Sequence, residues 1–186
     1  MRTHMNYRTL FLAFALTLVV IPASVSNAQR IESLPGYFDF DELEDIVGVE
    51  TTLEVNFKGA ILRMAAEAAR IEDDTLADLL LKLKGIQVRG YTLDEDSRKA
   101  LENRIGPLFR QMTDDGWDRV VRVRDEEEFV EMLVRDATGE RVEGLIVFVI
   151  GGGPNETVFV NIVGEIDPED IGRLGRRFRI GALEAL

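Results

Sequence analysis

Apolar and polar residues alternate along several stretches of the chain, and this alternation predicts a sheet. In residues 51–57, Leu53, Val55 and Phe57 fall on one face, as expected for a strand with one buried side. Residues 86–93 predict a second strand. The last third adds four β-rich runs joined by short turns, at 119–124, 129–135, 141–150 and 157–164. That spacing is typical of an antiparallel meander.

One of these runs differs from the others, because residues 145–150 (LIVFVI) are apolar at every position. A strand without alternation is covered on both faces, so we expect it at the centre of the sheet. The triplet Gly151–Gly153 follows it and precedes the next strand. It lacks the Lys-Ser/Thr pair and the following helix of a phosphate-binding loop, and it therefore predicts a hairpin turn.

Helical spacing replaces alternation in the segments between the predicted strands. Two stripes precede residue 85, the first of Ile61, Leu62, Ala65, Ala66 and Ala69 and the second of Leu76, Leu79, Leu80 and Leu83. Asp73 or Asp74 is placed to cap the second helix, and Gly85 is placed to end it.

A longer helix is expected from Asp96 or Ser97 to Gly116, with Gly106-Pro107 kinking or splitting it. A last helix is expected to begin at Asp167-Pro168 and to bury Ile171, Leu174 and Phe178. Helices followed by a meander predict a single α+β domain over residues 29–186. Its helices are expected on one face of an antiparallel sheet.

The first 28 residues have the pattern of a cleaved secretion signal. Arg2 and Arg8 precede an apolar run from Leu10 to Ile21, and small residues then lead to Ala28. Cleavage is expected between Ala28 and Gln29. The run is shorter than the roughly 20 residues that span a bilayer as a helix, so we expect no stable membrane insertion after cleavage. The mature protein is therefore expected in the periplasm or secreted.

Charge and composition exclude several classes of function. The chain holds 34 acidic and 22 basic residues, for a formal net charge of -12. Nucleic-acid binding requires a basic footprint, so we expect no nucleic-acid partner. There is no cysteine, and the single histidine, His4, lies in the leader. The mature chain thus lacks the usual nucleophile–base systems and zinc ligands, and no catalytic, metal or cofactor site is assigned. We expect a protein that is not an enzyme.

Two kinds of charged cluster remain. The acidic turns at 94–96, 114–115 and 125–128 lack the spacing of a calcium loop, and we interpret them as solvated or helix-capping. The other cluster lies near the C-terminus and consists of Arg173, Arg176, Arg177 and Arg179. These arginines either complement a helix C-terminus and pair with nearby acids, or form a docking patch for an acidic partner or an anionic headgroup. Trp117 is expected in the core or anchoring a sheet edge.

Five segments in this order resemble a bacterial exported family, the domain of unknown function 4252: LPGYFDF, LEVNFKGAILRMAAEAA, LKGIQVRGYTL, GWDRVVRVR and VFVNIVGEID. The resemblance covers residues 34–174. It implies export and a fold but transfers no site residue, and the chain departs from the lipoprotein members by lacking a cysteine. A link to extracytoplasmic-function sigma factors would suit a role in envelope stress sensing, although no residue here carries it.

Two functions remain open. The first is a non-enzymatic module of the bacterial envelope that binds another protein. The second is a small-ligand binder or a hydrolase based on carboxylates, for which paired acids suffice. A ligand site requires a concave apolar pocket with converging polar groups. A docking module instead requires an exposed apolar patch or an open sheet edge. The partner and the oligomeric state do not follow from the sequence.

Overall fold

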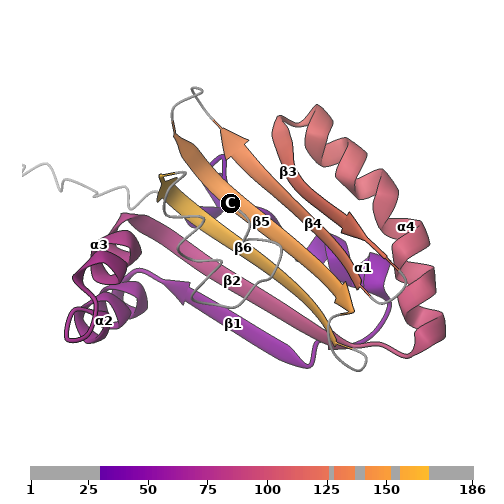
Figure 1. Ribbon diagram of the computed structural model, residues 1–186, viewed down its shortest axis with the longest axis horizontal. Coiled ribbons are helices and arrows are strands. Elements are labelled where there is room, and N and C mark those ends of the chain that lie inside the picture. Colours follow the sequence, from indigo (N-terminus) through magenta and orange to yellow (C-terminus); the bar gives the residue numbers. More distant parts are fainter. Residues whose placement is uncertain (1–29, 126–127, 137–140, 152–155, 168–186) are drawn as a thin grey trace, which may run out of the picture.

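A computed structural model describes residues 30–125, 128–136, 141–151 and 156–167. Its centre is one six-stranded antiparallel sheet with the strand order β1-β2-β6-β5-β4-β3 (Figure 1). The strands are β1 (Leu53–Lys58), β2 (Leu83–Thr92), β3 (Trp117–Arg124), β4 (Glu128–Asp136), β5 (Val142–Gly151) and β6 (Glu156–Ile166).

The expected meander is confirmed, because β3, β4, β5 and β6 pair with one another in chain order. The apolar run at 145–150 lies within β5, which has a strand on each side. Alternate residues of β5 enter two different cores. Ile146, Phe148 and Ile150 join the first, and Leu145 and Val147 join the second. A strand buried on both faces can therefore be recognised from its missing alternation.

The first core lies between one face of the sheet and the helices α1 (Asp41–Val47) and α4 (Glu95–Asp114). Helix α4 buries its expected face, which includes Leu101, Ile105, Leu108 and Met112. Its N-cap is Asp94, two residues before the expected start, and the Asp94 side chain accepts a hydrogen bond from the backbone N–H of Ser97 at 2.8 Å. That bond lowers the pKa of Asp94. The helix is not split at Pro107 but continues through it.

Helices α2 (Ala60–Ala69) and α3 (Asp74–Lys82) connect β1 to β2 and lie at the other end of the sheet (Figure 1). Leu62 and Leu79 place them in the second core, together with Met132 and Val147. The mixed α+β class is confirmed, but the helices are divided between two cores rather than gathered on one face. Asp73 caps α3 as expected, accepting from the backbone N–H of Leu76.

Gly85 does not end α3, because the chain enters β2 directly at Leu83. A Cβ at Gly85 would lie 2.0 Å from Cδ1 of Ile31, which belongs to the short 3-10 helix η1 (Ile31–Ser33). The glycine is therefore explained by close packing against the N-terminal segment rather than by a helix end.

The N-terminal residues 34–40, here called the strap, cross the sheet over β6 and β5. At the crossing Gly36 lies against Gly144, where a Cβ on Gly36 would lie 2.0 Å from the carbonyl oxygen of Glu143. Asn161 of β6 is fully buried. Its amide oxygen accepts from the N–H of Phe38 at 3.1 Å, and its amide nitrogen donates to Gly36 O at 3.0 Å. These contacts attach the strap to the sheet.

Candidate interaction surface

Exposed apolar side chains concentrate in one part of the described chain. Seven large hydrophobic residues are exposed in the described chain, and six of them lie between residues 53 and 81. They are Leu53 and Phe57 in β1, Ile61 and Met64 in α2, Ile71 in the turn after α2, and Leu81 in α3; the seventh is Val120 in β3. Single exposed hydrophobic residues are ordinary, whereas contiguous exposed apolar patches are typical of interaction sites.

Helix α2 has an apolar side that faces solvent as well as one that faces the core. Leu62 and Ala66 are buried against the sheet. Ile61 and Met64, three residues apart and so on one side of the helix, are 49% and 71% exposed. Ile71 follows in the turn and is 87% exposed. Ile61, which belongs to the stripe predicted from helical spacing, is thus on the exposed side of α2.

Strand β1 is one of the two edges of the sheet and has a regular backbone. Its pairing with β2 continues without a register shift from Leu53 opposite Gly90 to Lys58 opposite Gly85. No other described strand pairs with it. An edge strand of this kind presents unpaired backbone groups that another strand can bind. Together, β1 and the exposed side of α2, with Leu53, Phe57, Ile61, Met64 and Ile71, are called the β1–α2 edge below.

The opposite edge, β3, is protected against such pairing. Its register with β4 shifts between Arg119 and Val121, which is the mark of a β-bulge. Arg119 and Arg122 bind the fully buried carboxylate of Glu131 on β4, the latter with Nε at 2.7 Å from Oε2. The hydrogen bond to Glu131 raises the pKa of Arg122. Bulges and charged side chains are the usual protection of an edge strand, so β1 is the more open edge.

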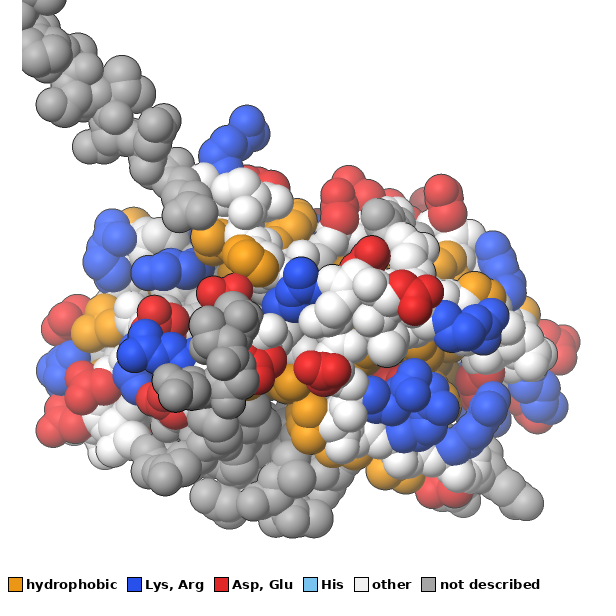
Figure 2. Space-filling model, turned by 90° about the horizontal axis from the view of Figure 1, so that it is seen from above, with side chains coloured by type: hydrophobic (Ala, Val, Ile, Leu, Met, Phe, Trp, Pro, Cys, Tyr) orange, Lys and Arg blue, Asp and Glu red, His pale blue; other side chains and the backbone are white. Residues whose placement is uncertain are grey.

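The face of the molecule drawn in Figure 2 carries both signs of charge. Figure 2 shows acidic and basic side chains interspersed over one face, with small hydrophobic patches between them. Arg70, for example, pairs with Asp74 and Asp78 and so connects the end of α2 to α3. Apolar contact is therefore the more distinctive property of the β1–α2 edge.

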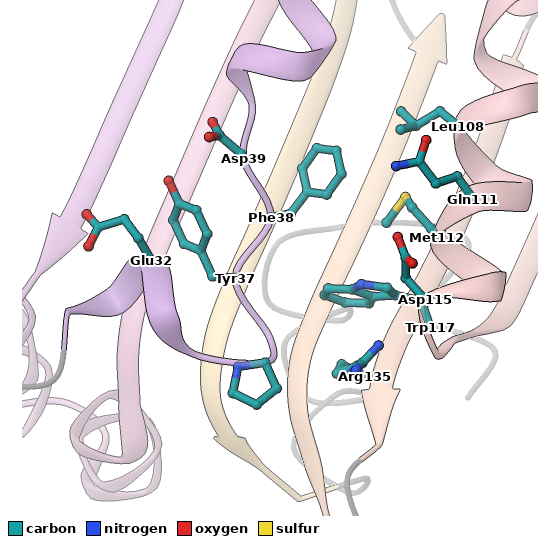
Figure 3. A pocket seen from close by; sticks show the side chains of 11 residues that line it. Glu32, Tyr37, Phe38, Asp39, Leu108, Gln111, Met112, Asp115, Trp117 and Arg135 are labelled. Atoms are coloured by element: carbon teal, nitrogen blue, oxygen red, sulfur yellow. The ribbon is translucent and has the colours of Figure 1, made fainter.

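A concave site is present as well, between the strap and the C-terminal half of α4 (Figure 3). This groove has a volume of about 420 Å³. Tyr37 and Phe38 line one side, Gln111 and Met112 the other, and Arg135 lies at one end. Its size is within the range of pockets that bind small molecules.

The residues singled out from the sequence are distributed unevenly. The cleavage pair Ala28 and Gln29, and the patch Arg173, Arg176, Arg177 and Arg179, lie outside the described residues. Of the acidic turns, Asp94 caps α4 and Asp125 accepts a hydrogen bond from the N–H of Glu128. Within the described ranges, no group of His, Cys, Asp and Glu side chains could hold a metal ion. Trp117 is buried in the first core, as expected.

A comparison with protein-family models matches residues 48–174 to a family described as a domain of unknown function, DUF4252. The match includes β1, α2 and the whole meander. Among curated proteins no relative matches the chain.

Proposed function

Because the chain belongs to the DUF4252 family, whose function is unknown, its role has to be inferred from its own surface, and we propose that it is an exported, non-enzymatic protein-interaction module of the bacterial envelope. The observation that carries the proposal is the β1–α2 edge. There a regular edge strand, which pairs with β2 on one side and with no described strand on the other, is followed along the chain by exposed apolar residues of α2. A partner of matching chemistry offers a strand for β1 and apolar side chains for Met64 and Ile71.

Export rests on the leader pattern of residues 1–28. No helix among the described residues is long and apolar enough to cross a membrane. Mass spectrometry of the protein purified from its host is expected to find a mature N-terminus at Gln29. An intact N-terminus at Met1 in the purified protein would contradict export by cleavage.

Replacing both Met64 and Ile71 with Asp is expected to reduce partner capture strongly without unfolding the protein. Both side chains are exposed, so their replacement opens no cavity in either core. Two charges at the centre of an apolar contact should weaken binding by at least about tenfold, which corresponds to ~1.4 kcal/mol. The measurement is a crosslinking pull-down from the envelope fraction of the native host, quantified by mass spectrometry, with circular dichroism to verify folding.

The control is Val120→Asp, which changes an exposed hydrophobic residue on the protected edge β3. This variant is expected to capture the partner as well as the unmodified protein does. Equal capture by the double variant would contradict docking at the β1–α2 edge. Identification of the captured partner as a member of a stress-response pathway would support a role in envelope stress sensing.

A further inference from the structure

The groove of Figure 3 is a built site rather than a gap between loosely packed segments. Its first side is the strap, which Asn161 and the Gly36–Gly144 contact attach to the sheet. Its second side is α4, whose Leu108 and Met112 are buried in the first core. Because both sides are anchored, the groove does not have to form when a ligand binds, which lowers the cost of binding.

Arg135 is the distinctive charged group of the groove. It lies on β4 directly opposite Trp117 of β3. Its guanidinium lies over Gly116, where a Cβ would be 2.7 Å from Nη1, and Gly116 also has a positive φ of 90°. Glycine at this position therefore makes room for the arginine. In the described part of the chain the half-buried Arg135 has no ion pair or hydrogen bond from its side chain.

None of the described acids that line the groove forms an ion pair with this arginine. Glu32 lies 3.8 Å from both Arg30 and Lys58. Asp39 accepts a hydrogen bond from the N–H of Asp41 at 3.0 Å. Asp115 lines the groove but is farther from Arg135 than the 4.0 Å of an ion pair. A guanidinium without an ion pair, in a protein with 34 acidic residues, is suited to bind an external anion. Carboxylates bind it well, because the planar guanidinium can donate two parallel N–H hydrogen bonds to their two oxygens.

Apart from the amide of Gln111, the rest of the lining consists of apolar or aromatic residues. Phe38, Leu108, Met112 and Trp117 are buried core residues whose edges reach the groove. Gln111 and Tyr37 add an amide and a phenol. A ligand that fits these groups carries a carboxylate beside an apolar or aromatic part.

We propose that this groove binds a carboxylate attached to an apolar group, with Arg135 pairing with the carboxylate and Met112 and Trp117 contacting the apolar part. Such a group occurs in small organic acids and at the C-terminus of a peptide. This site is separate from the β1–α2 edge, so either proposal can fail without the other.

The chain supplies its own reporter, because Trp117 is its only tryptophan and lines the groove. The experiment follows tryptophan fluorescence of the mature protein during titration with two matched pairs of probes. The first pair is phenylacetate and phenylacetamide. The second is N-acetyl-Gly-Phe with a free carboxylate and the same dipeptide as its C-terminal amide. We expect saturable changes with the acids and binding at least about tenfold weaker with the amides.

Arg135→Gln is expected to weaken binding of the acids to the level of the amides, and Arg135→Lys is expected to retain part of the affinity. Asp115→Asn is the control of opposite sign, since removing a negative charge near the anion should leave binding as tight or tighter. Circular dichroism and thermal unfolding verify that each variant folds. If Arg135→Gln does not fold, the comparison of acid and amide on the unmodified protein still decides.

Equal affinity for acid and amide, or no saturable change with any probe, would overturn the proposal. Unchanged binding by a folded Arg135→Gln would overturn it too. Saturation by the dipeptide acid alone would support it and identify a peptide C-terminus as the ligand. Saturation by both acids would support it and show that a carboxylate beside an aromatic group is sufficient.

Discussion

Replacing Val147 with Asp is expected to abolish soluble expression of the protein. Val147 lies in β5, between β4 and β6, and its side chain is 2% exposed within the second core. No described ion pair or hydrogen bond places a cation beside it. A buried carboxylate without a partner costs several kcal/mol, which is comparable to the roughly 5–15 kcal/mol by which domains are stable. The yield of soluble protein, with circular dichroism of any that is recovered, gives the measurement.

Val120→Asp is the matched control for this substitution as well. Val120 is 45% exposed on the edge strand β3, so the same change should alter the free energy of unfolding by less than about 0.5 kcal/mol. A normal yield of folded Val147→Asp would refute the central position of β5.

The second large effect is expected for Asn161→Leu, which should detach the strap from the sheet. The side chain of Asn161 is fully buried and is bonded to Phe38 N, Gly36 O and Leu145 O. Leucine is of similar size but makes none of these bonds, so buried backbone groups of the strap lose their partners. We expect a loss of about 2–4 kcal/mol in the free energy of unfolding, measured by urea denaturation.

Faster proteolytic cleavage after Tyr37 or Phe38 should accompany the loss of stability, because the strap would then be accessible. Asn56→Leu provides the control, since Asn56 is exposed in β1 and makes no described side-chain hydrogen bond. If Asn161→Leu were as stable as this control, the attachment of the strap would not depend on Asn161.

Elements in which apolar residues recur with a clear helix or strand period could be predicted from the sequence. Elements without such a period could not. The meander and the inward face of α4 follow directly from the placement of apolar residues. Helix α1 was not predicted, because its seven residues (DELEDIV) are too short and too acidic to show a stripe. Its burial depends on Leu43 and Val47, which pack against distant parts of the chain.

Pro107 illustrates a tertiary effect that a local rule misses. Proline removes one hydrogen bond of the helix, and this predicts a kink or a break. The buried Ile105 and Leu108 on either side of Pro107 are held by the same core, and the helix continues through it. Packing against the sheet stabilises both halves of α4 and so offsets the local cost.

The candidate sites were harder to predict than the fold, for a physical reason. The spacing of Ile61 and Leu62 identifies them as apolar positions of one helix, but only the placement of α2 decides that Leu62 is buried and Ile61 exposed. The groove joins Tyr37, Gln111 and Arg135, which are far apart in the sequence. No local pattern connects them. That Arg135 has no ion-pair partner among the described residues depends on the distances among these segments.

The unequal edges of the sheet have a consequence for stoichiometry. A sheet that is open at both edges can add strands in both directions and grow into a fibre. Here β3 carries a bulge and a cluster of arginines, while β1 remains regular. If a partner strand adds at β1 as proposed, the described sheet offers one such edge, and strand addition would be monovalent. Two copies that meet through β1 would form a closed, symmetric pair, and a partner strand bound there would exclude that pair.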